Sequence, residues 1–494
     1  MFEQFKKLAG HSAVYGLAVV GSTIGMMICT PMFLHHLNRS EYGMNEILNV
    51  LASMIFVVAN LGISAVFIKV YINDCKNEGE RKQMFSSMLV FAVALTVFMV
   101  LLTTAVARPV SSLLFKQSHY GNLVRLATTA SAMQLIMAVI MQSLRAKEWA
   151  VKFVIVNLIQ FAVVILLNLY FMLVRHMGVF GIQLAALLCN LAAVLVGLFV
   201  LRADLVLRFS GRIVKTVLLT SLPVLPSSIA PWILNVSDRY FLNGFCGLSD
   251  TGLYAAGYKV GMIGVFTVMN AVGYAWPTIF YANSDSEDAP RLCANVLKYY
   301  LVVLAAVALA FSVFSPEIVR VIAKREYWDA YRIVPYIAGA YVLYAVQFYT
   351  IPLFIRANRG KALSIIMGGA AAGNLLLNLL LIPHYGIWGA VASTVITFSA
   401  ETAVSVWYAT NLFAVPHEFA NLAKVIVLTG LVFLAFRHIE AVSWGTFLLK
   451  SVSFPTLVIL LFLTRFFKPR ELALMRAVLG TAAGKLLPGT SKVA

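Results

Sequence analysis

The residues most able to do chemistry in this sequence are the few charges inside its long apolar stretches. Lys259 lies about nine residues into the predicted helix that begins at Ser249 and contains the apolar stretch 253–280, and nine helical residues cover about 13 Å. A lysine ammonium at that depth in a membrane is costly unless an anion compensates it. We therefore predict that Lys259 binds an anionic group. The alternative is a lysine whose apolar stem reaches back to the membrane surface.

Three arginines are further candidates for binding phosphate, because a guanidinium presents a planar fork that matches phosphate oxygens. Arg239 follows Asp238 at the end of the stretch 216–238. Because adjacent residues on a helix do not face each other, we predict that these two do not form one ion pair. Arg145 and Arg356 follow two other apolar stretches at equivalent positions. They are interpreted either as phosphate ligands at the mouth of a cleft or as positively charged interfacial anchors.

Two acidic residues are the candidates for ion coupling. Glu401 lies about fifteen residues into the stretch 386–410, with no charged neighbour within several turns. We interpret it either as a carboxyl kept protonated by desolvation or as a group that couples transport to H⁺ or Na⁺. Asp238 is the second candidate. The sequence contains neither a nucleotide-binding glycine loop nor a nucleophile turn, and its five cysteines lack metal-ligand spacing. We therefore predict no enzyme activity, no cofactor and no metal site.

The amino-acid composition indicates that the helices carrying these charged residues are surrounded mainly by lipid. Of 494 residues, 61% are hydrophobic and 12% are charged, whereas a soluble domain is roughly one quarter charged. A bilayer core needs about 20 apolar residues per helix, and in lipid the backbone must pair within each helix. We therefore predict an all-α integral membrane protein of about fourteen transmembrane helices. The predicted spans are 12–34, 46–70, 84–107, 120–144, 151–173, 179–201, 216–238, 253–280, 295–314, 333–355, 362–382, 386–410, 421–437 and 444–464.

The basic residues predict the orientation of these helices. Lys and Arg concentrate in the loops on the side of the amino terminus, so the positive-inside rule places both termini in the cytoplasm. The loop holding Arg320 to Arg332 is the exception, because this count places it outside; its acidic residues indicate an ion-pair cluster. The net charge of +18 is thereby explained by topology. We predict no nucleic-acid binding, since the sequence contains no recognition module.

An internal repeat predicts how the helices are grouped. Ser40-Glu41-Tyr42-Gly43-Met44 is echoed by Ser249-Asp250-Thr251-Gly252-Leu253, and three further matches follow in order at nearly the same spacing. We predict two six-helix lobes, 1–211 and 212–411, followed by two extra helices and a basic cytoplasmic tail in 412–494. Six helices are an even number, so the lobes are related by a pseudo-two-fold axis along the membrane normal. Such lobes form a central cleft that is opened alternately to either face, as in transporters.

Several of these motifs resemble the Wzx-type polysaccharide flippases, of the superfamily that also holds multidrug (MATE) exporters and lipid II flippases. The resemblance covers about 400 residues and depends on these stretches: Leu37-Asn38-Arg39-Ser40-Glu41-Tyr42-Gly43, Asn60-Leu61-Gly62-Ile63-Ser64, Leu222-Pro223, Asp238-Arg239-Tyr240-Phe241-Leu242, Gly252-Leu253-Tyr254, Tyr258-Lys259 and Ala275-Trp276-Pro277.

The resemblance implies that the chain flips an undecaprenyl-pyrophosphate-linked oligosaccharide from the inner to the outer leaflet of a bacterial cytoplasmic membrane. The products of such flippases are surface polysaccharides such as the O-antigen of lipopolysaccharide. The family's cationic cleft for pyrophosphate would here be formed by Lys259, Arg239, Arg145 and Arg356. The expected partners are the lipid-linked oligosaccharide, membrane lipids, H⁺ or Na⁺, and the polysaccharide polymerase machinery. The alternatives are a lipid II flippase, a MATE-like ion-coupled drug exporter and a membrane-embedded glycosyltransferase.

Overall fold

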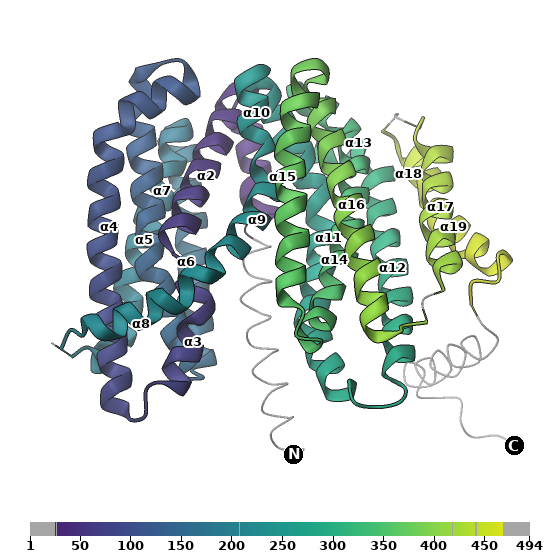
Figure 1. The fold of residues 1–494 in the computed structure, drawn as a ribbon. Coiled ribbons are helices and arrows are strands. Elements are labelled where there is room, and N and C mark those ends of the chain that lie inside the picture. Colours follow the sequence, from purple (N-terminus) through teal and green to yellow (C-terminus); the bar gives the residue numbers. More distant parts are fainter. Residues whose placement is uncertain (1–24, 26, 207, 417, 440–441, 468–494) are drawn as a thin grey trace, which may run out of the picture.

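The computed structural model describes residues 25, 27–206, 208–416, 418–439 and 442–467. Within these ranges every regular element is a helix (Figure 1). Thirteen helical stretches in the described part of the chain are long and apolar enough to cross a membrane, and they correspond one by one to the last thirteen predicted spans. The predicted first span, 12–34, lies mostly outside the described residues. The prediction of an all-α multi-pass membrane protein is therefore confirmed.

The first lobe contains five of these membrane-spanning stretches. Its first span is broken near the middle, because Leu61 and Gly62 have positive φ angles of 49° and 72°. A side chain at Gly62 would also meet the Ser221 carbonyl oxygen at 2.6 Å, so glycine is required there for both conformation and space. The helices are α2 (Arg39–Ala59), α3 (Ile63–Asn73), α4 (Glu78–Phe115), α5 (Gly121–Ala146), α6 (Ala150–Leu169), continued by a π-helical turn (Tyr170–Val174), and α7 (Gly178–Val200).

A bent connection leads from the first lobe to the second. Helix α8 (Gly211–Ser221) packs against α3 and α4, and after a short 3₁₀ turn α9 (Leu225–Val236) packs against α15 and α2 (Figure 1). The second lobe then follows. Its elements are α10 (Asp238–Phe245), α11 (Leu248–Asn283), α12 (Ala289–Val313), α13 (Ser315–Ile322), the 3₁₀ segment η5 (Arg325–Arg332), α14 (Val334–Arg356), α15 (Gly360–Tyr385) and α16 (Ile387–Phe413).

The last helices, α17 (Phe419–Phe436), α18 (Trp444–Ser451) and α19 (Ser453–Leu463), form an additional group beside α12. A buried ion pair ties this group to the second lobe. The Lys450 ammonium lies 2.6 Å from a carboxylate oxygen of Glu317 on α13, and the Lys450 side chain is fully buried. A pair this buried is sensitive to loss of either partner, because the remaining charge would have no counterion.

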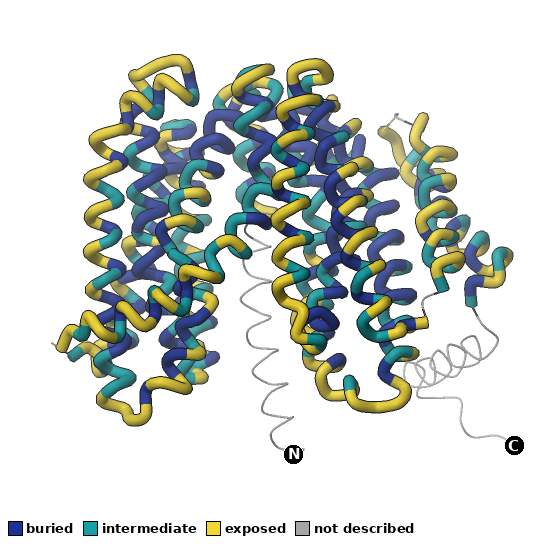
Figure 2. The backbone as a smooth tube through the Cα atoms, in the orientation of Figure 1, coloured by how far each residue is buried: buried dark blue, intermediate teal, exposed yellow. Residues whose placement is uncertain are grey.

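The buried apolar residues form three clusters, which explains how the lobes hold together. One cluster lies within the first lobe and α8, and one lies within the second lobe and the last helices. The third joins α2, α4 and α5 to α11 and η5. Figure 2 shows the contrast between the largely buried α14 and the more exposed α4, whose apolar side chains face outward as expected for contact with lipid. The limits 1–211, 212–411 and 412–494 stay a prediction.

Candidate substrate cavity

A cavity of about 510 Å³ lies between the two lobes. Helix α2 of the first lobe forms one wall, and α9, α10, α11 and α14 form the others. Two of the predicted phosphate-binding cations, Lys259 and Arg239, line it. The remaining lining residues combine one carboxylate with amide, hydroxyl, aromatic and aliphatic side chains: Glu46, Asn49, Val50, Ser53, Asn235, Val236, Tyr258, Met262, Phe266, Met269, Asn270, Tyr341, Tyr344 and Phe348.

Lys259 reaches across the cavity to the other lobe. Its ammonium nitrogen lies 2.6 Å from Oε1 of Glu46 on α2 and 5.3 Å from the centre of the Tyr42 ring. The Glu46 side chain is 6% exposed and that of Lys259 is 21% exposed. The predicted need for an anion is therefore met within the chain, by a carboxylate of the opposite lobe.

Glu46 was missed by the sequence analysis because the predicted span begins at this residue. The helix begins seven residues earlier, at Arg39, so Glu46 lies about two turns inside it. A local signal for the earlier start exists: Asn38 accepts a hydrogen bond from the Glu41 backbone, and the Glu41 side chain accepts one from the Asn38 backbone. This reciprocal capping box marks a helix start.

Arg239 and Asp238 form an ion pair, so the prediction that they do not was wrong. One Arg239 nitrogen, Nη1, lies 2.8 Å from the Asp238 carboxylate and donates to the Asn235 carbonyl oxygen at 2.6 Å. Both residues lie in the first turn of α10, just after α9 ends. The arginine side chain folds back over that break toward the preceding turn and thereby meets the aspartate. Tyr254 donates a hydrogen bond to the other Asp238 oxygen, and both charged side chains are buried.

A set of phenol groups lines the second-lobe side of the cavity. Tyr341 donates to the Asn235 amide oxygen at 2.7 Å, and its hydroxyl lies 3.1 Å from that of Tyr258. The Asn235 amide donates to the Tyr344 hydroxyl at 3.4 Å, and the Arg239 guanidinium lies 4.3 Å from the centre of the Tyr258 ring. Rings combined with hydroxyls can stack on sugars and hydrogen-bond to them. The signal in the sequence is the tyrosine-rich stretch 334–356, which the sequence analysis did not single out.

The other two predicted arginines lie away from this cavity. Arg145 and Arg356 are exposed in the last turns of α5 and α14. Arg356 pairs with the Asp285 carboxylate at 2.5 Å. The structure thus brings Arg239 and Lys259 together but does not bring Arg145 and Arg356 to them. A role for these two arginines at the mouth of the cleft stays a prediction.

Glu401 is buried in α16 and does not line the cavity. Neither of its carboxylate oxygens has a hydrogen-bond partner among the described residues, and the same holds for the buried side-chain polar atoms of Gln347 and Ser405. Helix α16 is tied to α14 next to this position, because Thr402 donates to the Leu343 carbonyl oxygen at 2.7 Å. A buried carboxyl without a described partner fits a protonated structural group as well as a group that exchanges a cation.

The two lobes touch at the backbone level at the end of the cavity where α2 begins. A Cβ atom on Gly43 of α2 would lie 2.0 Å from the Leu248 carbonyl oxygen, and one on Gly252 of α11 would lie 2.0 Å from the Arg39 carbonyl oxygen. Gly43 and Gly252 are the equivalent glycines of the internal repeat. The two halves of the repeat therefore meet each other, and glycine at both positions lets the helices approach this closely.

Segment η5 adds to this contact between the lobes. The Tyr327 hydroxyl donates to the Leu37 carbonyl oxygen at 3.1 Å, and Arg39 donates to the Glu326 carbonyl oxygen. Arg39 also lies 3.7 Å from the Asp329 carboxylate. The charged loop that the sequence predicted to lie outside thus covers the start of α2.

Comparisons with known proteins agree with this fold. A probable low-salt glycan biosynthesis flippase of Haloferax volcanii is 20% identical over 219 residues, 42% of this chain and 45% of that protein. An uncharacterized membrane protein of Methanocaldococcus jannaschii is 21% identical over 223 residues, 44% of each chain. The matched region of the chain thus spans less than half the length of these curated relatives.

Two kinds of solved structure share the fold. A lipid II flippase in an inward closed conformation has a TM-score of 0.74 at 11% identity, over 91% of this chain and 98% of that one. An inward-facing multidrug resistance MATE transporter has a TM-score of 0.66 at 16% identity, over 81% and 98%. Residues 36–332, more than half of the chain, match the family described as polysaccharide biosynthesis protein. This agrees with the resemblance found in the sequence motifs, and the chain belongs to that family.

Proposed function

We propose that this membrane protein flips an undecaprenyl-pyrophosphate-linked oligosaccharide from the inner to the outer leaflet by alternating access, for surface polysaccharide biosynthesis. The single observation that carries the proposal is the cavity between the lobes, where Lys259 and Arg239 lie beside tyrosine side chains. The cations suit a pyrophosphate and the tyrosines suit the adjoining sugar. The family membership and the name of the Haloferax volcanii relative support the same function.

The ion pairs of the cavity suggest how an anionic substrate would bind. Both cations are paired in this structure, Lys259 with Glu46 and Arg239 with Asp238. A pyrophosphate would replace Glu46 as the counterion of Lys259, so the ammonium would never be left buried without an anion. Such an exchange keeps the desolvation cost low, because breaking a buried pair without replacement is strongly destabilising.

The remaining sequence-based roles fit into the same proposal. Arg145 and Arg356 would gather the substrate at the cytoplasmic mouth, and Glu401 and Asp238 would couple transport to H⁺ or Na⁺. The chain would reside in a bacterial cytoplasmic membrane with both termini in the cytoplasm, near the polysaccharide polymerase machinery.

Deletion of the gene tests this proposal. Loss of the flippase should make a lipid-linked oligosaccharide accumulate in the inner leaflet, where mass spectrometry identifies its repeat unit. Reconstitution of the purified chain into vesicles that carry this lipid, or lipid II instead, separates the two flippase functions. Transport of lipid II alone, or of neither lipid, would contradict the proposed substrate.

A further inference from the structure

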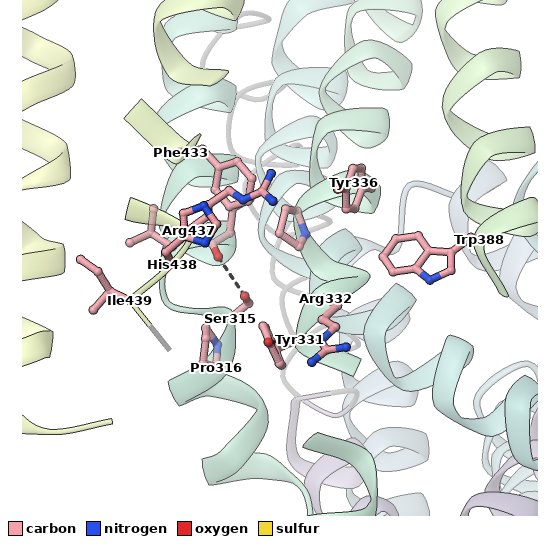
Figure 3. Close-up of a pocket in the computed structure, with 13 residues that line it drawn as sticks. Ser315, Pro316, Tyr331, Arg332, Tyr336, Trp388, Phe433, Arg437, His438 and Ile439 are labelled. Atoms are coloured by element: carbon pink, nitrogen blue, oxygen red, sulfur yellow. Dashed lines mark hydrogen bonds between the residues drawn. The ribbon is translucent and has the colours of Figure 1, made fainter. Parts of the chain in front are cut away.

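Glu401 lies outside both pockets described for this chain. The substrate cavity does not include it, and neither does a second pocket of about 230 Å³ at the end of the second lobe where α2 begins in the first. Figure 3 shows Trp388, near the start of α16, on one side of this second pocket. Glu401 lies about 20 Å farther along the same helix. It therefore belongs to a separate region, inside the second lobe.

Three buried polar side chains of this region lack hydrogen bonds. Gln347 and Ser405 are fully buried, and Glu401 is 2% exposed. Both carboxylate oxygens of Glu401, both polar atoms of the Gln347 amide and the Ser405 hydroxyl oxygen have no hydrogen-bond partner among the described residues. Buried polar atoms are nearly always paired, because leaving one unpaired is destabilising. Several such atoms in one region therefore indicate a ligand that pairs with them.

Helices α14 and α16 run side by side in the same direction through this region. Thr402 of α16 donates to the Leu343 carbonyl oxygen of α14 at 2.7 Å. Farther along both helices, Phe354 of α14 stacks on Tyr408 of α16, with ring centres 5.4 Å apart. These two contacts define the faces that the helices turn toward each other.

The unpaired side chains lie on these facing sides. Gln347 is one turn beyond Leu343 on α14, and Ser405 is one turn beyond Thr402 on α16. Glu401 precedes Ser405 by four residues, so the two share one face of α16. Packing of the helices therefore gathers a carboxylate, an amide and a hydroxyl in one buried interface.

Tyr344 connects this region to the substrate cavity. Its ring stacks on Phe398 of α16 with ring centres 4.7 Å apart, and its hydroxyl accepts a hydrogen bond from Asn235. The phenol lies within electrostatic range of the Glu401 carboxyl, and Tyr344 lines the cavity. The unpaired side chains therefore lie behind the wall of the substrate cavity that Tyr344 forms.

No described cation pairs with the Glu401 carboxylate. The described helices that pack most closely against α16 are α14, α15, α10 and α11. Their charged and histidine side chains are at helix ends or in ion pairs with other residues: Asp238, Arg239, Asp250, Lys259, Arg356, Lys361 and His384. The titratable group that faces Glu401 is the Tyr344 phenol. An ionised Glu401 would thus need a counterion from solution.

We propose that Glu401, Gln347 and Ser405 bind a sodium ion between α14 and α16. Carboxylate, amide and hydroxyl oxygens are the ligands that hard cations take. A single positive charge neutralises the single carboxylate, whereas a divalent cation would leave an uncompensated charge in the buried interface. The choice of sodium, and its use in coupling, rest on the proposed function, whereas the binding itself is measured without transport.

Thermal unfolding of the purified full chain, in NaCl or in choline chloride at equal ionic strength, tests the proposal. A ligand that binds only the folded chain raises the unfolding temperature as its concentration rises. The wild type should therefore be stabilised by NaCl relative to choline chloride. Glu401→Gln should lose this sodium-dependent gain and stay folded, because the neutral amide has the same shape and needs no counterion.

The neutral ligands are tested by the sodium concentration that gives half of the gain. Gln347→Leu and Ser405→Ala should each raise this concentration roughly tenfold or more. The matched control is Ser143→Ala. Ser143 is a buried serine of the first lobe that donates to the Val139 carbonyl oxygen of its own helix, α5, so its removal should leave the half-saturating concentration unchanged.

Three outcomes would overturn the sodium site. The first is no sodium-dependent gain in the wild type between pH 6 and 8, which would make Glu401 a protonated structural carboxyl. The second is a gain that persists in Glu401→Gln, and the third is an equal effect of Ser405→Ala and Ser143→Ala. Glycan flipping is assayed separately in vesicles. Loss of flipping with intact sodium binding would refute the proposed function and leave this site standing.

Discussion

Adding a methyl group at Gly43 should open the contact between the lobes. The Cβ of Gly43→Ala would lie 2.0 Å from the Leu248 carbonyl oxygen, whereas real Cβ contacts are essentially never shorter than 3.0 Å. Helices α2 and α11 must therefore separate by about 1 Å at this point. Because the obstructing atom belongs to the backbone of a helix, no side-chain rotation can relieve the clash.

The size of the effect follows from the cost of overpacking, about 1–3 kcal/mol. This cost falls only on the conformation in which α2 and α11 touch. It should therefore shift the equilibrium between closed and open forms by roughly 5- to 150-fold. The assay uses a cysteine at Asn270, which lines the substrate cavity, in a background without the native cysteines. An impermeant thiol reagent added outside should modify this cysteine roughly 5- to 150-fold faster in the Gly43→Ala variant than in the parent.

The variant Gly252→Ala should behave alike, because its Cβ would lie 2.0 Å from the Arg39 carbonyl oxygen. Gly273→Ala is the matched control: it lies on the same helix, α11, with nothing within 4 Å of its Cβ. Its labelling rate should equal that of the parent. If Gly43→Ala and Gly252→Ala are inserted at normal levels and label no faster than Gly273→Ala, the glycine contact does not close the cavity.

Three further predictions concern charge and topology. Lys259→Ala should abolish glycan export at normal protein levels, while Lys259→Arg should keep part of it. In thermal unfolding, a double-mutant cycle of Lys259→Ala with Glu46→Ala should give a coupling energy of roughly 0.5–3 kcal/mol, and a coupling energy of zero would contradict the ion pair. Glu401→Gln should weaken the pH dependence of flipping without lowering expression if this carboxyl couples protons; an unchanged profile would assign it to packing. Cysteines at Phe245 and Tyr385 should react with an impermeant reagent from outside and those at Gly79 and Arg359 should not; the reverse pattern would invert the proposed orientation.

The helices were predictable from the sequence because the bilayer fixes their length and apolar character. The need of Lys259 for an anionic partner was also predictable, since an unpaired ammonium at its depth in α11 would be costly. Its partner was not, because hydropathy placed the start of α2 at Glu46 and so assigned this residue to a helix end. The capping box at Asn38 locates the true start, and a polar helix end can extend beyond the apolar stretch that hydropathy detects.

The pairing of Asp238 with Arg239 shows a second limit. The rule that neighbours on a helix point apart holds inside a continuous helix, but α9 ends at Val236 and α10 begins at Asp238. The close contact of Gly43 with Gly252 shows a third limit. The repeat showed that the two glycines occupy equivalent positions. Their contact depends on how the two lobes pack, and no local sequence pattern predicts that packing.

The two ion pairs of the cavity differ in what a movement of the lobes would do to them. Asp238 and Arg239 both belong to α10, so their pair can persist when the lobes separate. Glu46 and Lys259 belong to α2 and α11, the helices that also carry the touching glycines, and Glu46 lies three residues beyond Gly43. Separation of α2 from α11 therefore breaks the contact between the two glycines and, in the same movement, takes the Glu46 carboxylate away from Lys259. An ammonium that loses its carboxylate needs another anion, so under the proposed function the movement that opens the cavity at this end would also favour a pyrophosphate at Lys259.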